Sequence, residues 1–144
     1  MLVVVAIVGI LAAAAQPVLE LSQRRNRELE LRQSLRTLRA AIDAYKRAGE
    51  DHRIAVPPDA SGYPPTLQSL VEGVPDLRHS ERRLYFLRRL PRDPFADPAL
   101  PAEQTWGLRS HDSPPDAPAA GRDVFDAHSL SDRQGLDGSR LRDW

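Results

Sequence analysis

The chain contains no cysteine, which excludes disulfide bonds and thiolate metal sites. It has only two Trp, three Tyr and three Phe, against thirteen prolines in 144 residues. Few aromatic residues and many prolines predict a loop-rich fold with little sheet. The net charge is zero, which argues against an electrostatic nucleic-acid binder.

Motifs for catalysis are also lacking. His52, His79, His111 and His128 are scattered and show no HExxH or other paired spacing. There is no glycine-rich phosphate loop and no GxSxG motif. Ser, His and Asp are all so common in this chain that their presence together is not evidence for a Ser–His–Asp catalytic triad. We therefore predict that the protein is not an enzyme.

Charge is absent from the N-terminus. The first 15 residues, MLVVVAIVGILAAAA, have no charged or hydrogen-bonding side chain, and the first charge is Glu20. A membrane-spanning helix needs roughly 20 apolar residues and satisfies its own backbone groups in hydrocarbon. Residues 1–19 are therefore predicted to form a membrane-embedded helix. Pro17 should remove one backbone hydrogen bond and kink this helix.

Two other interpretations of the apolar run remain open. A secretory signal peptide could be cleaved after the four alanines, but no basic residue precedes the run. A buried core helix of this uniform apolarity would need a large domain around it. The sequence that follows favours a membrane helix that continues into a polar one.

Residues 20–48 predict this amphipathic continuation, because they contain no glycine or proline. Apolar residues recur there at steps of three and four, as on one face of an α-helix. The mostly polar residues 22–28 should project free of the globular part, and Gly49 should end the helix. The apolar stripe comprises Leu31, Leu35, Leu38, Ile42 and Tyr45.

Residues 49–144 are predicted to form a small globular head with a modest core. Pro64-Pro65-Thr66 should open a short helix that ends at Gly73, with Leu67, Leu70 and Val71 facing inward. Residues 84–87 are too few to assign to helix or strand.

The last third predicts a short antiparallel sheet from residues 105–110 and 123–129. The C-terminal segment should be an ordered loop held by Leu136, Leu141 and Trp144. The predicted fold class is α+β: a long protruding N-terminal α-helix packed on a small loop-rich head.

These pieces together resemble a known family. The opening LVVVAIVGILAAAAQP is similar to the N-terminal helix of type IV pilin-like proteins. The later blocks YPPTLQSLVEG, LRRLPRDPF, WGLRS and DVFDAHSLSD with GLDGSRLRDW resemble, in order and spacing, the major pseudopilins of type II secretion systems. The resemblance covers nearly the whole chain.

The resemblance implies a structural filament subunit with a pilin-like fold. Family members sit in the inner membrane with the head in the periplasm, and then stack into a filament that assists protein export. Implied partners are other pseudopilin copies, minor pseudopilins, the inner-membrane assembly platform and membrane lipid. The residues implied in membrane and filament contacts are Leu2, Val3, Val4, Val5, Ile7, Val8, Gly9, Ile10, Leu11 and Pro17.

A calcium site in the C-terminal loop is also implied by the resemblance. Many major pseudopilins bind Ca²⁺ there through aspartates and backbone carbonyls, and oxygen ligands suit this cation. Asp132 and Asp137 are the candidate ligands, whereas Asp126 should lie on the preceding strand. Ordinary loop aspartates that accept backbone N–H bonds are the alternative.

The family pattern has a basic leader, a glycine before an aromatic residue, and a glutamate inside the apolar run. The sequence shows none of these, so we expect the true start to lie upstream of Met1. Without the leader, Arg24, Arg25 and Arg27 would by the positive-inside rule lie in the cytoplasm. The alternative function is a membrane-anchored periplasmic binding module that does not assemble.

Overall fold

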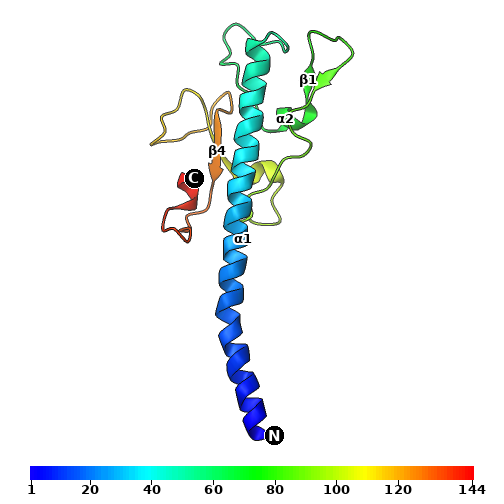
Figure 1. The fold of residues 1–144 in the computed structure, drawn as a ribbon. Coiled ribbons are helices and arrows are strands. Elements are labelled where there is room, and N and C mark those ends of the chain that lie inside the picture. Colours follow the sequence, from blue (N-terminus) through cyan, green and yellow to red (C-terminus); the bar gives the residue numbers. More distant parts are fainter.

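A single helix dominates the architecture. The computed structural model describes residues 1–144, with side chains described for all except residues 14 and 15. Helix α1 (Leu2–Glu50) has 49 residues and is about 74 Å long at the usual rise per residue. Its C-terminal half carries a small head, and its N-terminal half protrudes (Figure 1). The predicted long helix and small head with short antiparallel strands are confirmed.

The apolar stripe of α1 faces the core, as its spacing predicts. Leu31, Leu38 and Ile42 are fully buried, and Leu35 and Tyr45 nearly so. They pack in one cluster with residues from every part of the head, including Leu70, Trp106, Val124, Ala127 and Leu141. The core is therefore built along one side of α1.

The end of α1 lies two residues beyond the predicted stop. Gly49 stays helical, and the positive φ (54°) occurs at His52 instead. A Cβ on Gly49 would lie 2.8 Å from Cγ2 of Val56. This glycine is therefore required because the returning chain packs closely against the last turn, not because it caps the helix.

Helix α2 (Gln68–Glu72) is the short helix predicted from its proline-rich start. The backbone N–H of Ser69 donates to Thr66 Oγ1 at 3.2 Å, and Gly73 follows the helix with φ 73°. Leu67 and Leu70 are buried and Val71 is half-buried. The predicted end at Gly73 is confirmed, whereas the helix begins later than predicted, at Gln68 with Leu67 as its N-cap, because Pro64-Pro65-Thr66 form the turn before it.

Two separate two-stranded antiparallel sheets complete the head. Strand β1 (Val74–Pro75) pairs with β2 (Arg83–Leu84), which shows that Leu84 lies at the end of a strand. Strand β3 (Trp106–Arg109) pairs with β4 (Asp126–Ser129), confirming the predicted sheet of the last third. Short 3₁₀ helices, η1 (Ala102–Thr105) and η2 (Leu141–Asp143), flank this sheet.

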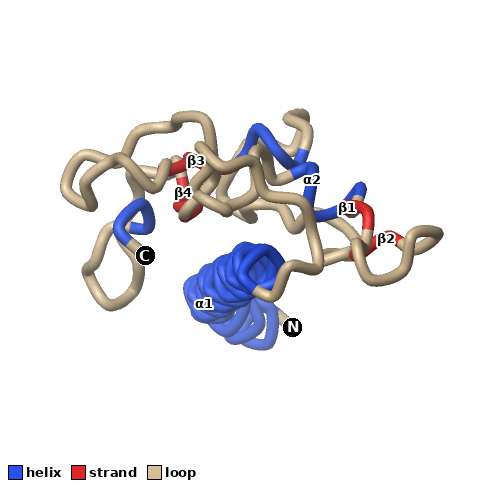
Figure 2. The backbone as a smooth tube through the Cα atoms, turned by 90° about the horizontal axis from the view of Figure 1, so that it is seen from above, coloured by secondary structure: helices blue, strands red, loops and turns tan.

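The head covers only one side of α1. Viewed along the helix axis, the sheets, α2 and the connecting loops form an arc on one side, and the opposite side of α1 carries no other element (Figure 2). The C-terminus lies beside the middle of α1 (Figure 1). A bare flank therefore runs the whole length of the helix.

Candidate functional site

The protruding arm of α1 (residues 2–19) presents an apolar surface over residues 2–13. Leu2 is 88% exposed and Ile7, the least exposed of the large apolar side chains up to Leu11, is still 53% exposed. None of the described residues in this segment is buried, and its length and composition suffice for one membrane span. A core helix covered by the rest of this chain is therefore ruled out for the described residues. The exposed members of the predicted set are Leu2, Val3, Val4, Val5, Ile7, Val8, Ile10 and Leu11.

Gly9 lies in the middle of this arm. A Cβ built at Gly9 would meet nothing within 4 Å, so no contact inside this chain explains the glycine. Small residues at helix surfaces allow a second helix to approach closely in a membrane. The position fits a contact with another molecule.

Pro17 lies inside α1, near the end of the arm, and the helix continues through it to Glu50. Proline lacks the N–H that would bond one turn back, so the helix is weakest here. The predicted kink stays a prediction, but the continuity of α1 across this point is established.

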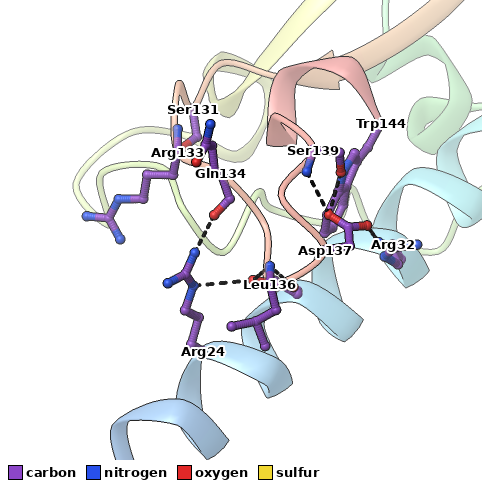
Figure 3. Close-up of polar contacts among 10 residues, drawn as sticks. Arg24, Arg32, Ser131, Arg133, Gln134, Leu136, Asp137, Ser139 and Trp144 are labelled. Atoms are coloured by element: carbon purple, nitrogen blue, oxygen red, sulfur yellow. Dashed lines mark hydrogen bonds and ion pairs between the residues drawn. The ribbon is translucent and has the colours of Figure 1, made fainter.

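The expectation that residues 22–28 project free of the head is wrong at Arg24 and Glu28, which contact the C-terminal loop, although residues 22–27 are exposed. Glu28 is only 7% exposed, and both of its carboxylate oxygens accept the backbone N–H of Leu136, at 3.0 and 3.1 Å. Arg24 pairs with Glu28 at 3.4 Å and donates to the carbonyl of Gln134. The C-terminal loop reaches down α1 and contacts it at Arg24 and Glu28 (Figure 3).

The same loop is held one turn higher by Arg32. Its guanidinium donates to Asp137 Oδ2 at 2.8 Å and lies 3.9 Å from the ring centroid of Trp144. The indole N–H of Trp144 donates to Ser139 Oγ at 2.6 Å. Trp144 and Leu141 are thus confirmed as anchors of the C-terminal segment, whereas Leu136 is 40% exposed and contributes through its backbone.

A third arginine on α1 ties the sheet to the chain end. Arg39 Nε donates to Asp126 Oδ1 at 2.8 Å, and its NH2 group donates to the backbone oxygens of Ala127 and Trp144, at 3.3 and 2.7 Å. Asp126 begins β4, as predicted. Arg24, Arg32 and Arg39 therefore form a ladder of contacts from α1 to the segment 126–144.

This ladder could not be found from the sequence. The members on α1 are separated from their partners by 87 to 110 residues, and arginine is the most common charged residue of the chain. The only signal is that Arg32, Arg39 and Glu28 lie at helical spacing beside the apolar stripe.

The two predicted calcium ligands are each engaged by an arginine. Asp137 accepts from Arg32, as well as from the N–H and Oγ of Ser139 at 2.9 and 2.6 Å. Asp132 accepts from Arg142 at 2.6 Å. Among the described residues there is no group of three or more His, Asp or Glu side chains that could hold a metal ion. Calcium needs six to eight oxygens, so this arrangement does not fit a preformed site, and calcium binding stays a prediction.

The histidines do not converge on a site. His52 and His79 are exposed, and His111 stacks on Tyr63 at 5.5 Å between centroids. His128 faces Gly107 across the β3–β4 pair. Burial lowers the pKa of His128 from its ordinary value of 6.5.

Hydrogen-bonded aspartates occur in three loops of the head; Asp76 and Asp123 are buried and Asp137 is exposed. Burial alone would raise the pKa of Asp123, but the hydroxyls of Ser61 and Ser110 and the N–H of His111 donate to its carboxylate, so the pKa is lowered. For Asp76, burial is likewise outweighed by donors, chiefly the N–H of Arg78 and the guanidinium of Arg53. The pKa of Asp137 is lowered mainly by the donors of Ser139.

Comparison of the chain with protein-family models, with curated proteins and with solved structures gave no match.

Proposed function

We propose that this protein is a structural subunit of a pilin-like filament, of the type II secretion pseudopilus or a related kind. The observation that carries the proposal is the uncovered apolar arm: eight large apolar side chains between Leu2 and Leu11 are more than half exposed. Such a surface is stable only in lipid or against other apolar helices.

The layout of the molecule is compatible with an arm that lies in lipid and with one that packs against other apolar helices. The arm is long enough to cross a bilayer, and the head begins only where the apolar side chains end. The long N-terminal helix with a small α+β head is compatible with a pilin-like arrangement. Gly9, which contacts nothing in its own chain, would let the arms of neighbouring copies pack closely.

In this proposal the subunit is held in the inner membrane with its head in the periplasm, and then enters a filament in which the arms form the core. Other copies, minor pseudopilins and an inner-membrane assembly platform are the partners. The protein has no catalytic role.

Cysteine crosslinking tests the proposal without background, because the chain has no cysteine. We expect Val8→Cys, in membranes of cells that also produce the assembly machinery, to give a disulfide-linked dimer on oxidation, the largest species that one thiol per chain allows. Val8→Cys in detergent micelles serves as the control and should remain monomeric.

Two outcomes would contradict the proposal. Strictly monomeric Val8→Cys in those membranes would favour a membrane-anchored binding module instead. Release of the intact chain by alkaline carbonate extraction would show that the arm does not span the bilayer at all.

A further inference from the structure

A basic cavity lies where the head meets the protruding arm. It has a volume of about 460 Å³ and is lined from α1 by Glu20, Arg24 and Arg27, and from the head by Phe95, Arg133 and Gln134. Segments far apart in the sequence therefore meet at the lower edge of the head, next to the apolar arm.

The cavity has an excess of positive charge. Three guanidinium groups line it, against the single carboxylate of Glu20. Arg24 is already engaged by Glu28 and Gln134. The side chains of Arg27 and Arg133 are exposed, and in the part of the chain that the structure describes they make no hydrogen bond or ion pair. Figure 3 shows the Arg133 guanidinium extending on the same side of the loop as that of Arg24.

The position of the cavity along the axis of α1 matches the depth of the lipid headgroup layer. Leu21 is the last exposed apolar residue of the arm before the polar stretch. Arg24 and Arg27 follow it by about 4.5 and 9 Å at 1.5 Å per residue. The headgroup layer extends roughly 5–7 Å beyond the hydrocarbon on each side. With the arm in a bilayer, these arginines lie at or just above the phosphates.

We propose that this cavity binds the headgroup phosphate of an anionic phospholipid. Arg27 and Arg133 donate to the phosphate oxygens, a geometry that suits the planar guanidinium, and Phe95 contacts the apolar part of the lipid. This site depends on the membrane placement in the proposed function. It adds that the head itself binds anionic lipid before assembly.

The test uses the full chain in phosphatidylcholine nanodiscs that contain a photoactivatable phosphatidylglycerol or, in a parallel sample, the matching phosphatidylcholine. Crosslinked peptides are identified by mass spectrometry. We expect phosphatidylglycerol adducts on the segments around Phe95 and Gln134, and a fall of roughly five-fold or more in their yield for Arg27→Gln/Arg133→Gln.

Arg47→Gln/Arg82→Gln is the matched control. It removes the same charge from two exposed arginines that lie away from the cavity, and the adduct yield should be unchanged. Soluble glycerophosphate in excess distinguishes a lipid from a free phosphate: a lipid site retains its adducts, whereas their loss would show that the cavity prefers free phosphate and would overturn the proposal.

Equal adduct yields for the two lipids, or equal losses in the two double variants, would also overturn it. Carbonate extraction of the same samples separates this failure from that of the proposed function. A chain that stays embedded but shows no lipid preference refutes only the headgroup site.

Discussion

The carboxylate of Glu28 receives the backbone N–H of Leu136 on both of its oxygens, at 3.0 and 3.1 Å, across 108 residues of sequence. Together with the hydrogen bond from Arg24 to the carbonyl of Gln134, this contact holds the C-terminal loop to the lower end of the part of α1 that carries the head. A buried carboxylate at the end of a polar helical stretch thus helps to set where the free arm meets the head.

Glu28→Ala should loosen the C-terminal loop. The Leu136 amide would lose its acceptor, at a cost of about 1–2 kcal/mol in the free energy of unfolding, and amide exchange at 134–138 should accelerate. Glu30→Ala is the control, because Glu30 is exposed and accepts no hydrogen bond within the described residues. Equal exchange rates in the two variants would show that the contact does not hold the loop.

The loop should stay closed without calcium, because arginines already neutralise Asp132 and Asp137. We expect a chelator to shift the melting temperature of the head by no more than about 1 °C, and Arg32→Gln to lower it by several degrees. Near-ultraviolet circular dichroism in detergent micelles measures both. A rise in melting temperature with added Ca²⁺ that is lost in Asp132→Asn/Asp137→Asn would establish the calcium site instead.

Gly107→Ala should destabilise the β3–β4 pair. A Cβ at this position would overlap the imidazole ring of His128, and overpacking of this kind costs about 1–3 kcal/mol. Thermal unfolding of the single and double variants measures the effect. In Gly107→Ala/His128→Ala the obstructing ring is absent, so much of the loss attributed to the clash should disappear. Simply additive losses would refute the clash.

Stability should fall in two steps as the pH is lowered. The folded-state pKa of His128 lies below its ordinary value of 6.5, so the unfolded chain takes up this proton first and stability declines below about pH 6.5. Asp76, Asp123 and Asp137 have folded-state pKa values below 3.8, so their contribution is present above that value and is lost as the pH falls through the lowered pKa values.

Melting temperatures measured from pH 8 to pH 3 check both steps, and His128→Asn should remove the upper one alone. A pH profile that is identical in this variant and in the unaltered chain would assign the upper step to another group.

Gly9→Leu should reduce assembly without affecting the head. Nothing in the chain lies within 4 Å of the added Cβ, so the melting temperature should be unchanged, while a bulky side chain keeps neighbouring helices apart. In the Val8→Cys background the yield of disulfide-linked dimer should fall several-fold. Val5→Leu, a small change at a residue that is already large and exposed, is the control. An unchanged dimer yield in Gly9→Leu would place Gly9 outside the contact.

Local signals predicted the elements well. The three-and-four spacing of leucines predicts the buried face of α1, and Gly73 predicts the end of α2, because helical periodicity and helix ends are properties of neighbouring residues. The β3 and β4 segments were found by composition and by the proline-rich connection between them.

What the sequence could not predict was how the loops return to α1. The polar residues 22–28 contain the pattern of a solvated helix face, yet Glu28 is buried by a loop more than 100 residues away. Glycine at position 49 is typical of a helix end, but in the structure it leaves room for the side chain of Val56 to pack against the helix. The partners of the arginines on α1 and the basic cavity depend on the same long-range return, which no local pattern encodes.

Helix α1 is continuous from Leu2 to Glu50, so no flexible linker separates arm and head, and Pro17 is the weakest point between them. If the arm lies in a bilayer as proposed, a displacement of the arm by one residue along its axis would raise the head by about 1.5 Å. An axial force on the apolar end would therefore reach the head, and bending at Pro17 is where part of it would be absorbed.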